Sequence, residues 1–149
     1  MRVYLDCCCY NRPYDDLSHL TVGLEAQAKL YIQNEIRRGK YKLVTSEMLN
    51  FEVGNCPVAI RRKTILSYIE ENSSVHVGPE NSGRVKEMAY KIMETGVKYK
   101  DACHVASALL ADCAYFISTD KRLLKYKTER MKIVNPIEFV REMEEKEYE

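Results

Sequence analysis

The sequence has few glycines and none of the glycine-rich phosphate-binding motifs. Only six of the 149 residues are glycine. No G-x-x-x-x-G-K-[ST] loop occurs, and no G-x-G-x-x-G follows the first predicted strand. A G-x-S-x-G nucleophile elbow is also absent. The first two absences argue against the common nucleotide-binding folds, and the third argues against α/β-hydrolases.

Long apolar runs are missing as well. A membrane-spanning helix needs ~20 consecutive apolar residues, and no stretch approaches that length. At the N-terminus, Asp6 interrupts the apolar residues before a signal peptide can develop. We therefore expect a cytoplasmic protein without membrane association.

No proline- or glycine-rich linker, repeat or low-complexity tract divides the chain. Hydrophobic residues make up 46% and charged residues 30%, an ordinary globular balance. We expect a single domain over residues 1–149, with an acidic tail at about residues 142–149 that ends the last helix.

The six cysteines include no C-x-x-C pair, although residues 7–9 are three consecutive cysteines. Adjacent cysteines on a strand point to opposite faces and cannot converge on one ion. Disulfides are not expected in a reducing compartment. We therefore interpret the cysteines as small apolar fillers and not as zinc ligands.

Basic residues are grouped, although the net charge is only +1. Such groups usually form solvated helix ends or faces, but they also suit phosphate binding. The groups are Arg37, Arg38, Lys40 and Lys42; Arg61, Arg62 and Lys63; Lys98 and Lys100; and Lys121, Arg122, Lys125 and Lys127.

Short β-type runs alternate with longer segments of helical spacing. The predicted strands are residues 3–6, 42–45, 75–77, 115–118 and 131–134. The predicted helices include an apolar stripe over residues 24–36 with Gly39 as C-cap, a helix beginning at Pro57, a helix over residues 101–113 and a last helix beginning at Pro136. This alternation predicts a three-layer α/β fold, with a mostly parallel central sheet of about five strands and flanking helices.

Carboxylates from four chain segments are expected at one edge of this sheet. Ligands of open α/β sheets bind beyond the carboxyl ends of the strands. Asp6 closes the first strand, Asp120 follows the fourth, Asp101 begins a crossover helix, and Glu47 and Glu52 lie early in the helix after the second strand. Grouped carboxylates repel each other unless a cation joins them, and Mg²⁺ or Mn²⁺ binds through such oxygens. The sequence therefore predicts a divalent metal site.

Each residue of this group also has a purely structural interpretation. Asp120 fits an N-cap of a helix over residues 121–127, and Asp101 fits a first-turn acid facing the helix dipole. Asp6 is harder to explain in this way, because an ionised residue that ends a buried strand needs partners. His104 lies one turn after Asp101, where it could support a site, but we interpret it as a helix-surface or packing residue.

Helical periodicity separates the two glutamates. At about 100° per residue, Glu52 falls within the apolar, sheet-facing stripe of its helix. Glu47 lies roughly 140° away, where a first-turn glutamate is explained by the helix dipole. We therefore predict that Glu52, and not Glu47, is the second acid of the site.

Three motifs resemble the PIN-domain family, especially the VapC-like toxins and their solitary relatives. They are VYLDCCCYNR at the start, LVTSEMLNFEVGN near residue 50, and KYKDACHVASALLADCAYFISTDKRLL from residue 98. The resemblance implies an Mg²⁺- or Mn²⁺-dependent endoribonuclease that leaves a 5′-phosphate. It implies that the catalytic and metal-binding residues are Asp6, Glu52, Asp101 and Asp120.

The resemblance extends to neighbouring positions. Residues that fall where the family often has polar supporting groups are Asn11, Ser46 and Thr119. Cys7 departs from the pattern, because the family usually has a small hydroxyl residue there. Basic residues near the predicted site that would guide the RNA backbone are Lys98, Lys100, Lys121 and Arg122.

Partners and alternative functions stay open at this stage. If the chain is the toxin of a toxin–antitoxin pair, a small antitoxin protein would block the site. Dimers are common in the family, so a homodimer is a further expectation. The first alternative is a PIN-like module that binds RNA or protein without cutting. A haloacid-dehalogenase-type phosphatase ranks third, because its D-x-D motif is missing: Asp6 is followed by Cys7-Cys8.

Overall fold

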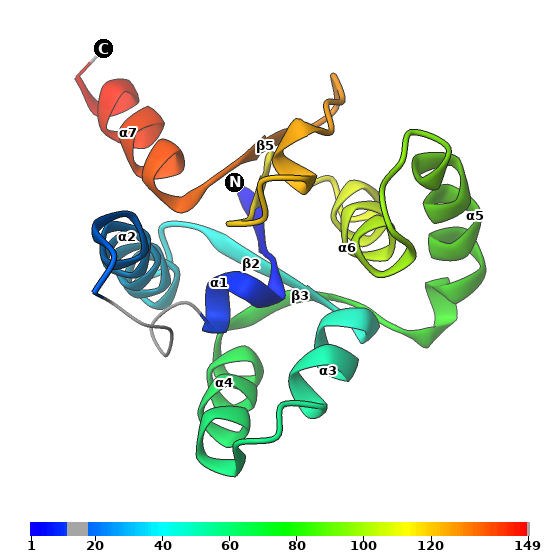
Figure 1. Ribbon diagram of the computed structural model, residues 1–149, viewed down its shortest axis with the longest axis horizontal. Helices are drawn as coiled ribbons and strands as arrows, with labels where there is room; N and C mark the ends of the chain where they lie inside the picture. Colours follow the sequence, from blue (N-terminus) through cyan, green and yellow to red (C-terminus); the bar gives the residue numbers. More distant parts are fainter. Residues whose placement is uncertain (12–17, 149) are drawn as a thin grey trace.

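The computed structural model describes residues 1–11 and 18–148, and its centre is a five-stranded sheet (Figure 1). All neighbouring strands pair in parallel, in the order β3-β2-β1-β4-β5. The strands are β1 (Arg2–Leu5), β2 (Lys42–Ser46), β3 (Ser73–Val77), β4 (Tyr115–Ile117) and β5 (Lys132–Val134). The predicted α/β fold is confirmed, and each predicted strand lies within two residues of its observed bounds.

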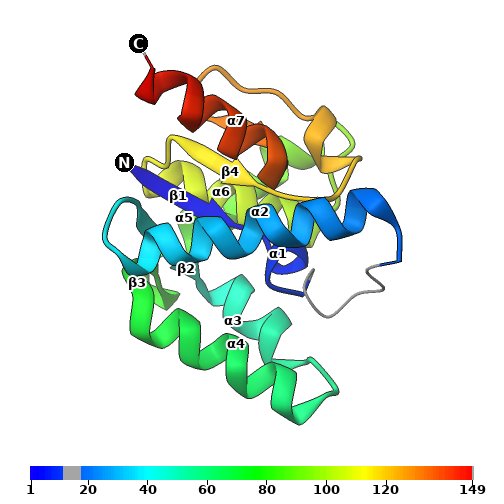
Figure 2. The same ribbon diagram turned by 90° about the vertical axis from the view of Figure 1, so that its left-hand side faces the viewer.

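Helices cover both faces of the sheet, because side chains alternate along each strand. Val3 and Leu5 of β1 pack in one buried cluster, whereas Tyr4 packs in the other and stacks on Phe116 with ring centroids 5.2 Å apart. The first cluster is covered by α1 (Cys7–Asn11), α2 (Leu20–Arg37), α3 (Glu47–Gly54), α4 (Ala59–Asn72) and α7 (Pro136–Glu147). The second is covered by α5 (Ser82–Met93) and α6 (Tyr99–Leu110). Figures 1 and 2 show α2 and α7 side by side.

Local sequence signals set several helix ends. The Ser46 hydroxyl accepts a hydrogen bond from the Leu49 N–H at 3.1 Å, which caps α3. Asn135 caps α7 in the same way, and Pro136 is the first residue of that helix, as predicted. After α2, Gly39 has a φ of +86°, which suits the glycine predicted there.

Three predicted local structures are wrong. The cysteines at residues 7–9 do not extend a strand, because the chain turns into the short helix α1 directly after Asp6. The helix predicted over residues 121–127 is reduced to one 3₁₀ turn, η3 (Leu123–Lys125). Pro57 does not begin α4, since it lies before the N-cap residue Val58.

The apolar stripe predicted for α2 is only partly buried. Leu24 and Tyr31 are exposed, whereas Glu35 is buried with 8% of its side chain accessible. Glu35 forms ion pairs with Arg38 at 3.1 Å and with Lys40 at 3.7 Å. These pairs explain how a carboxylate is tolerated there, and they engage two residues of the first basic group.

The acidic C-terminal residues are mostly helical, since α7 continues to Glu147. Glu142 forms an ion pair with Lys132 at 3.3 Å, and Glu147 pairs with Lys40. All six cysteines are free, and four are buried, which agrees with their interpretation as fillers. Among the described residues, no helix has the length and apolar character needed to cross a membrane.

Candidate active site

Asp6 lies at the carboxyl end of the central strand β1, and only 7% of its side chain is accessible. Its carboxylate accepts hydrogen bonds from the Cys7 N–H at 2.8 Å and from the Ser118 hydroxyl at 2.9 Å. The Cys8 thiol donates to the same carboxylate at 3.4 Å. These donors supply the partners that an ionised group needs at the end of a buried strand.

His104 connects Asp6 to Glu52 and is fully buried. Its Nε2 atom lies 2.8 Å from Glu52 Oε1 and 3.9 Å from Asp6 Oδ1. On the other side of the ring, Nδ1 lies 2.6 Å from the Tyr4 hydroxyl, which in turn lies 2.7 Å from the Ser46 hydroxyl. The interpretation of His104 as a surface or simple packing residue is therefore wrong, because it bridges helix, strand and carboxylates.

The electrostatics of His104 favour its charged form. Burial lowers the pKa of this imidazole, but the hydrogen bond to Glu52 and the charges of Asp6 and Asp101 outweigh burial and raise the pKa above its usual value. In the imidazolium form both ring nitrogens donate, to Glu52 and to the Tyr4 hydroxyl. His104 thus holds the Glu52 carboxylate in place with a charge-assisted bond.

Glu52 and Glu47 point to different partners, as helical periodicity predicted. Glu52 bonds to His104 and has 24% of its side chain accessible. Burial raises the pKa of Glu52, but the His104 hydrogen bond and charge lower it below the usual value overall. Glu47 is 55% accessible and lies 2.9 Å from His76 Nε2. Only Glu52 is therefore tied to the group that contains Asp6.

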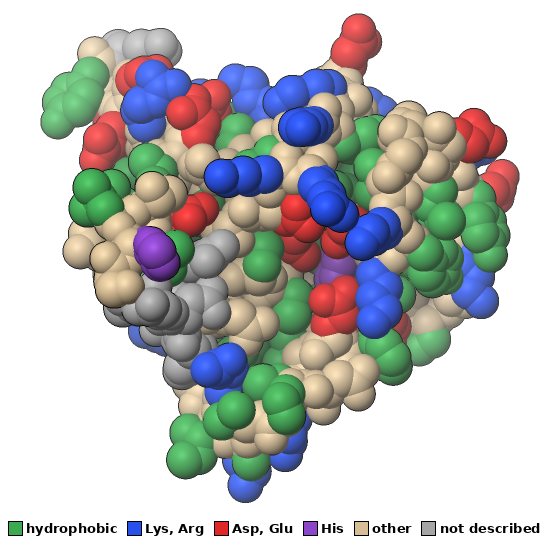
Figure 3. Space-filling model, viewed as in Figure 1, with side chains coloured by type: hydrophobic (Ala, Val, Ile, Leu, Met, Phe, Trp, Pro, Cys, Tyr) green, Lys and Arg blue, Asp and Glu red, His purple; other side chains and the backbone are tan. Residues whose placement is uncertain are grey.

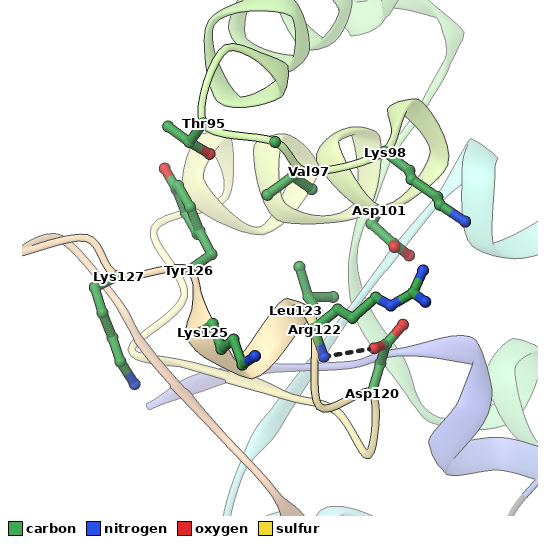
Figure 4. Close-up of a pocket in the computed structure, with 11 residues that line it drawn as sticks. Thr95, Val97, Lys98, Asp101, Asp120, Arg122, Leu123, Lys125, Tyr126 and Lys127 are labelled. Carbon is green, nitrogen blue, oxygen red and sulfur yellow. Dashed lines mark hydrogen bonds between the residues drawn. The ribbon is translucent and has the colours of Figure 1, made fainter.

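Asp101 and Asp120 line one pocket, which has a volume of about 510 Å³ (Figure 4). Burial raises the pKa of Asp101 to about 6, helped by the charges of Asp6 and Asp120. The Asp120 carboxylate also accepts a hydrogen bond from the Arg122 N–H at 2.9 Å, so it stabilises the local turn as well. The shift at Asp101 shows that carboxylates from separate segments are close enough to repel each other.

The predicted supporting residues have different positions. Ser46 caps α3 and bonds to Tyr4. The Asn11 amide donates to the Cys7 carbonyl at 3.2 Å, and the Thr119 N–H donates to the Cys8 thiol at 3.3 Å. The hydroxyl that bonds to Asp6 comes from Ser118, which the sequence analysis did not single out.

Cys7 stands where the resemblance implies a small hydroxyl residue. Burial, followed by the charges of Glu52 and Asp6, raises the pKa of the Cys7 thiol to about 12. The thiol is therefore protonated at neutral pH and does not act as a thiolate ligand. Ser118 compensates for the missing hydroxyl on the opposite side of Asp6.

Two of the four predicted RNA-binding residues lie in the pocket with the carboxylates. Lys98 and Arg122 point toward the space beside Asp101 and Asp120 (Figure 4). Lys100 lies over the Phe51 ring at 5.7 Å and helps to lower the pKa of Glu52. Lys121 is exposed outside the pocket. Figure 3 shows acidic side chains gathered beside a histidine, with basic side chains along their border.

The donor chemistry of this group suits a hard divalent cation, since four carboxylates from α3, α6 and the ends of β1 and β4 interact with one another or with His104. In the conformation described, however, Glu52 bonds to His104, and both Asp6 oxygens accept hydrogen bonds. Within residues 1–11 and 18–148, no three Asp, Glu, His or Cys side chains are already arranged to hold a metal ion. Metal binding would therefore require side-chain rearrangement.

Relief of this repulsion predicts that Asp101→Asn stabilises the metal-free protein. A carboxyl with a higher pKa in the folded than in the unfolded state makes folding less favourable as pH rises from its usual value of 3.8 through about 6. At pH 7.5 in EDTA, we expect the variant to melt about 2–4 °C above wild type. The difference should disappear below pH 4, where wild-type Asp101 is protonated. Thermal melts from pH 3.5 to 8 measure this, and equal melting temperatures at pH 7.5 would contradict it.

No protein-family model and no curated protein sequence matches the chain. Its fold is similar to a chain in the crystal structure of VapBC2 from Rickettsia felis bound to a DNA fragment from their promoter. The TM-score is 0.55 at 10% sequence identity, and the match covers 91% of this chain and 98% of that chain. The similarity supports the three-layer α/β fold. It leaves the chemistry to be argued from the residues.

Proposed function

We propose that this chain is a metal-dependent endoribonuclease of the PIN type. The observation that carries the proposal is the group formed by Asp6, Glu52, Asp101 and Asp120 at the carboxyl edge of the sheet, where His104 binds Glu52 and neighbouring acids raise the pKa of Asp101. Asp101 is the clearest sign, because a pKa shifted by several like charges is typical of functional sites. The fold shared with VapBC2 agrees with this proposal.

The four carboxylates would hold Mg²⁺ or Mn²⁺. Such a cation activates water and neutralises charge on a phosphodiester. The protein supplies the remaining elements. His104 orients Glu52, the Ser118 and Cys7 donors fix Asp6, and Lys98 and Arg122 lie where a phosphate next to Asp101 and Asp120 would be bound.

Calorimetric titration of metal-free protein with Mn²⁺ or Mg²⁺ tests the first half of the proposal. We expect saturable binding and a rise in unfolding free energy of roughly 2.7 kcal/mol at a hundredfold excess over Kd. Cleavage of end-labelled single-stranded RNA, with products checked for a 5′-phosphate, tests the second half. Absence of binding at millimolar metal, or equal cleavage in EDTA, would contradict the proposal.

A non-catalytic module is the second candidate, and one observation favours it: Glu52 and Asp6 are already engaged by protein donors, and no group of ligands is preformed among the described residues. RNA binding without metal-stimulated cleavage would support this alternative. The VapBC2 neighbour also suggests a toxin in a toxin–antitoxin pair, which co-purification with a small protein encoded beside this chain would test.

A further inference from the structure

The pocket that holds Asp101 and Asp120 continues well beyond the two carboxylates. It runs between the segment that joins α5 to α6 and the connection from β4 to β5 (Figure 4). The carboxylates lie at one end, whereas Thr95 and Tyr126 lie at the other. Its volume of about 510 Å³ is within the range of pockets for small organic ligands.

Four cations surround the pocket: Lys98, Arg122, Lys125 and Lys127. All four are exposed. Within the described residues, none of them forms an ion pair with an Asp or Glu. By contrast, Arg38 and Lys40 on the far side of the sheet are engaged by Glu35. The pocket thus carries a local excess of unpaired positive charge, which favours a phosphate-bearing ligand.

Tyr126 gives the outer end of the pocket an aromatic wall. The residue packs against the second buried cluster and is only partly exposed, so its ring is held in place. Tyr126 also lines a second hollow of about 440 Å³, in which further basic residues are Arg84, Lys91 and Arg130. An aromatic ring between two cationic hollows is typical of proteins that bind single-stranded nucleic acid, where bases stack on aromatic side chains and cations follow the backbone.

We propose that this pocket binds one nucleotide of a single-stranded RNA beside the cleaved bond, with its base against Tyr126. Lys98 and Arg122 hold its phosphate near the carboxylates, and the strand continues over Tyr126 into the second hollow. A duplex is disfavoured, because its base faces are covered by stacking and cannot reach the ring. This inference rests on the proposed nuclease function.

Binding in EDTA tests the inference without requiring cleavage. The probe is a fluorescein-labelled 12-nucleotide RNA, as a single strand and as a duplex, measured by anisotropy. We expect the wild-type protein to prefer the single strand. Tyr126→Leu should weaken single-strand binding by roughly 5- to 100-fold, the effect of losing one stacked base, whereas Tyr126→Phe should retain binding. Lys125→Ala should reduce the slope of log affinity against log salt by about 0.7.

Matched controls are Tyr148→Leu and Lys63→Ala, since both residues are exposed and lie outside the two hollows. Thermal melts establish that Tyr126→Leu is folded, and Tyr126→Phe tests stacking without loss of packing. Equal affinity for single strand and duplex, no RNA binding by wild type, or parallel losses in Tyr126→Phe and Tyr126→Leu would overturn the inference. Loss of metal-dependent cleavage with this binding pattern intact would refute only the proposed nuclease function.

Discussion

Replacement of Asp6 by Asn is expected to reduce metal-dependent RNA cleavage by about 100- to 1,000-fold, the usual effect of removing one charge-stabilising group from an active site. Asp6 is the most central of the four acids. Its carboxylate receives three protein donors, and His104 lies 3.9 Å away. The Asn amide oxygen can still accept from the Cys7 N–H, so the fold should persist while the negative charge is lost. Initial rates on labelled single-stranded RNA measure the effect.

Asp112→Asn provides a matched control for this experiment. Asp112 is exposed, lies outside the site and has a φ of 55°, a left-handed conformation that Asn tolerates well. We expect wild-type cleavage from this variant and an unchanged melting temperature. Wild-type cleavage by Asp6→Asn would show that the reaction takes place elsewhere on the protein.

The strands and the carboxyl edge could be predicted from sequence, because the signals for them are local. Each strand is a short β-type run, and Asp6 and Asp120 follow two of these runs directly. Parallel pairing then places the carboxyl ends of the strands at the same edge. The caps at Ser46 and Asn135 are equally local, since each side chain reaches a backbone N–H only three residues away.

The partners of the acids could not be predicted, because they depend on pairing between distant segments. Ser118 reaches Asp6 because β1 pairs with β4, with Leu5 opposite Ile117. His104 was misjudged for a different reason. Every residue from 102 to 109 of α6 is buried, so periodicity does not distinguish the side of the helix that faces Glu52. The buried tyrosine hydroxyl of β1 was the available signal, since such a group needs a polar partner.

The charged residues of α2 show the same limit. Periodicity predicted burial from apolar residues, yet Glu35 is buried, whereas Leu24 is exposed. The burial of Glu35 depends on Arg38 and on Lys40, and the second of these lies beyond the helix. An ion pair that forms across a helix end leaves no hydrophobic pattern in the sequence.

The choice between Glu52 and Glu47 leads to a second large expected effect. Glu52→Gln should reduce the rate of metal-dependent cleavage by about 100-fold or more, because it removes a charge that His104 holds beside Asp6. Glu47→Gln should leave the rate unchanged, since Glu47 is exposed and interacts with His76. Both changes are isosteric and lie in the same helix, so each variant controls for the other. Rates on one labelled single-stranded RNA, with and without Mn²⁺, give the comparison.

A spectroscopic measurement separates this role of Glu52 from a merely structural one. The hydrogen bond to Glu52 is the largest of the influences that raise the pKa of His104. In metal-free Glu52→Gln, the pKa of this imidazole should therefore fall toward or below its usual value, because burial then opposes a weakened attraction. NMR titration of the histidine ring resonances would follow this change, while Glu47→Gln should leave the His104 resonance where it is in wild type. An inactive Glu47→Gln beside an active Glu52→Gln would show that the assignment is wrong. An unchanged His104 titration in Glu52→Gln would show that the 2.8 Å contact does not hold the pair together in solution.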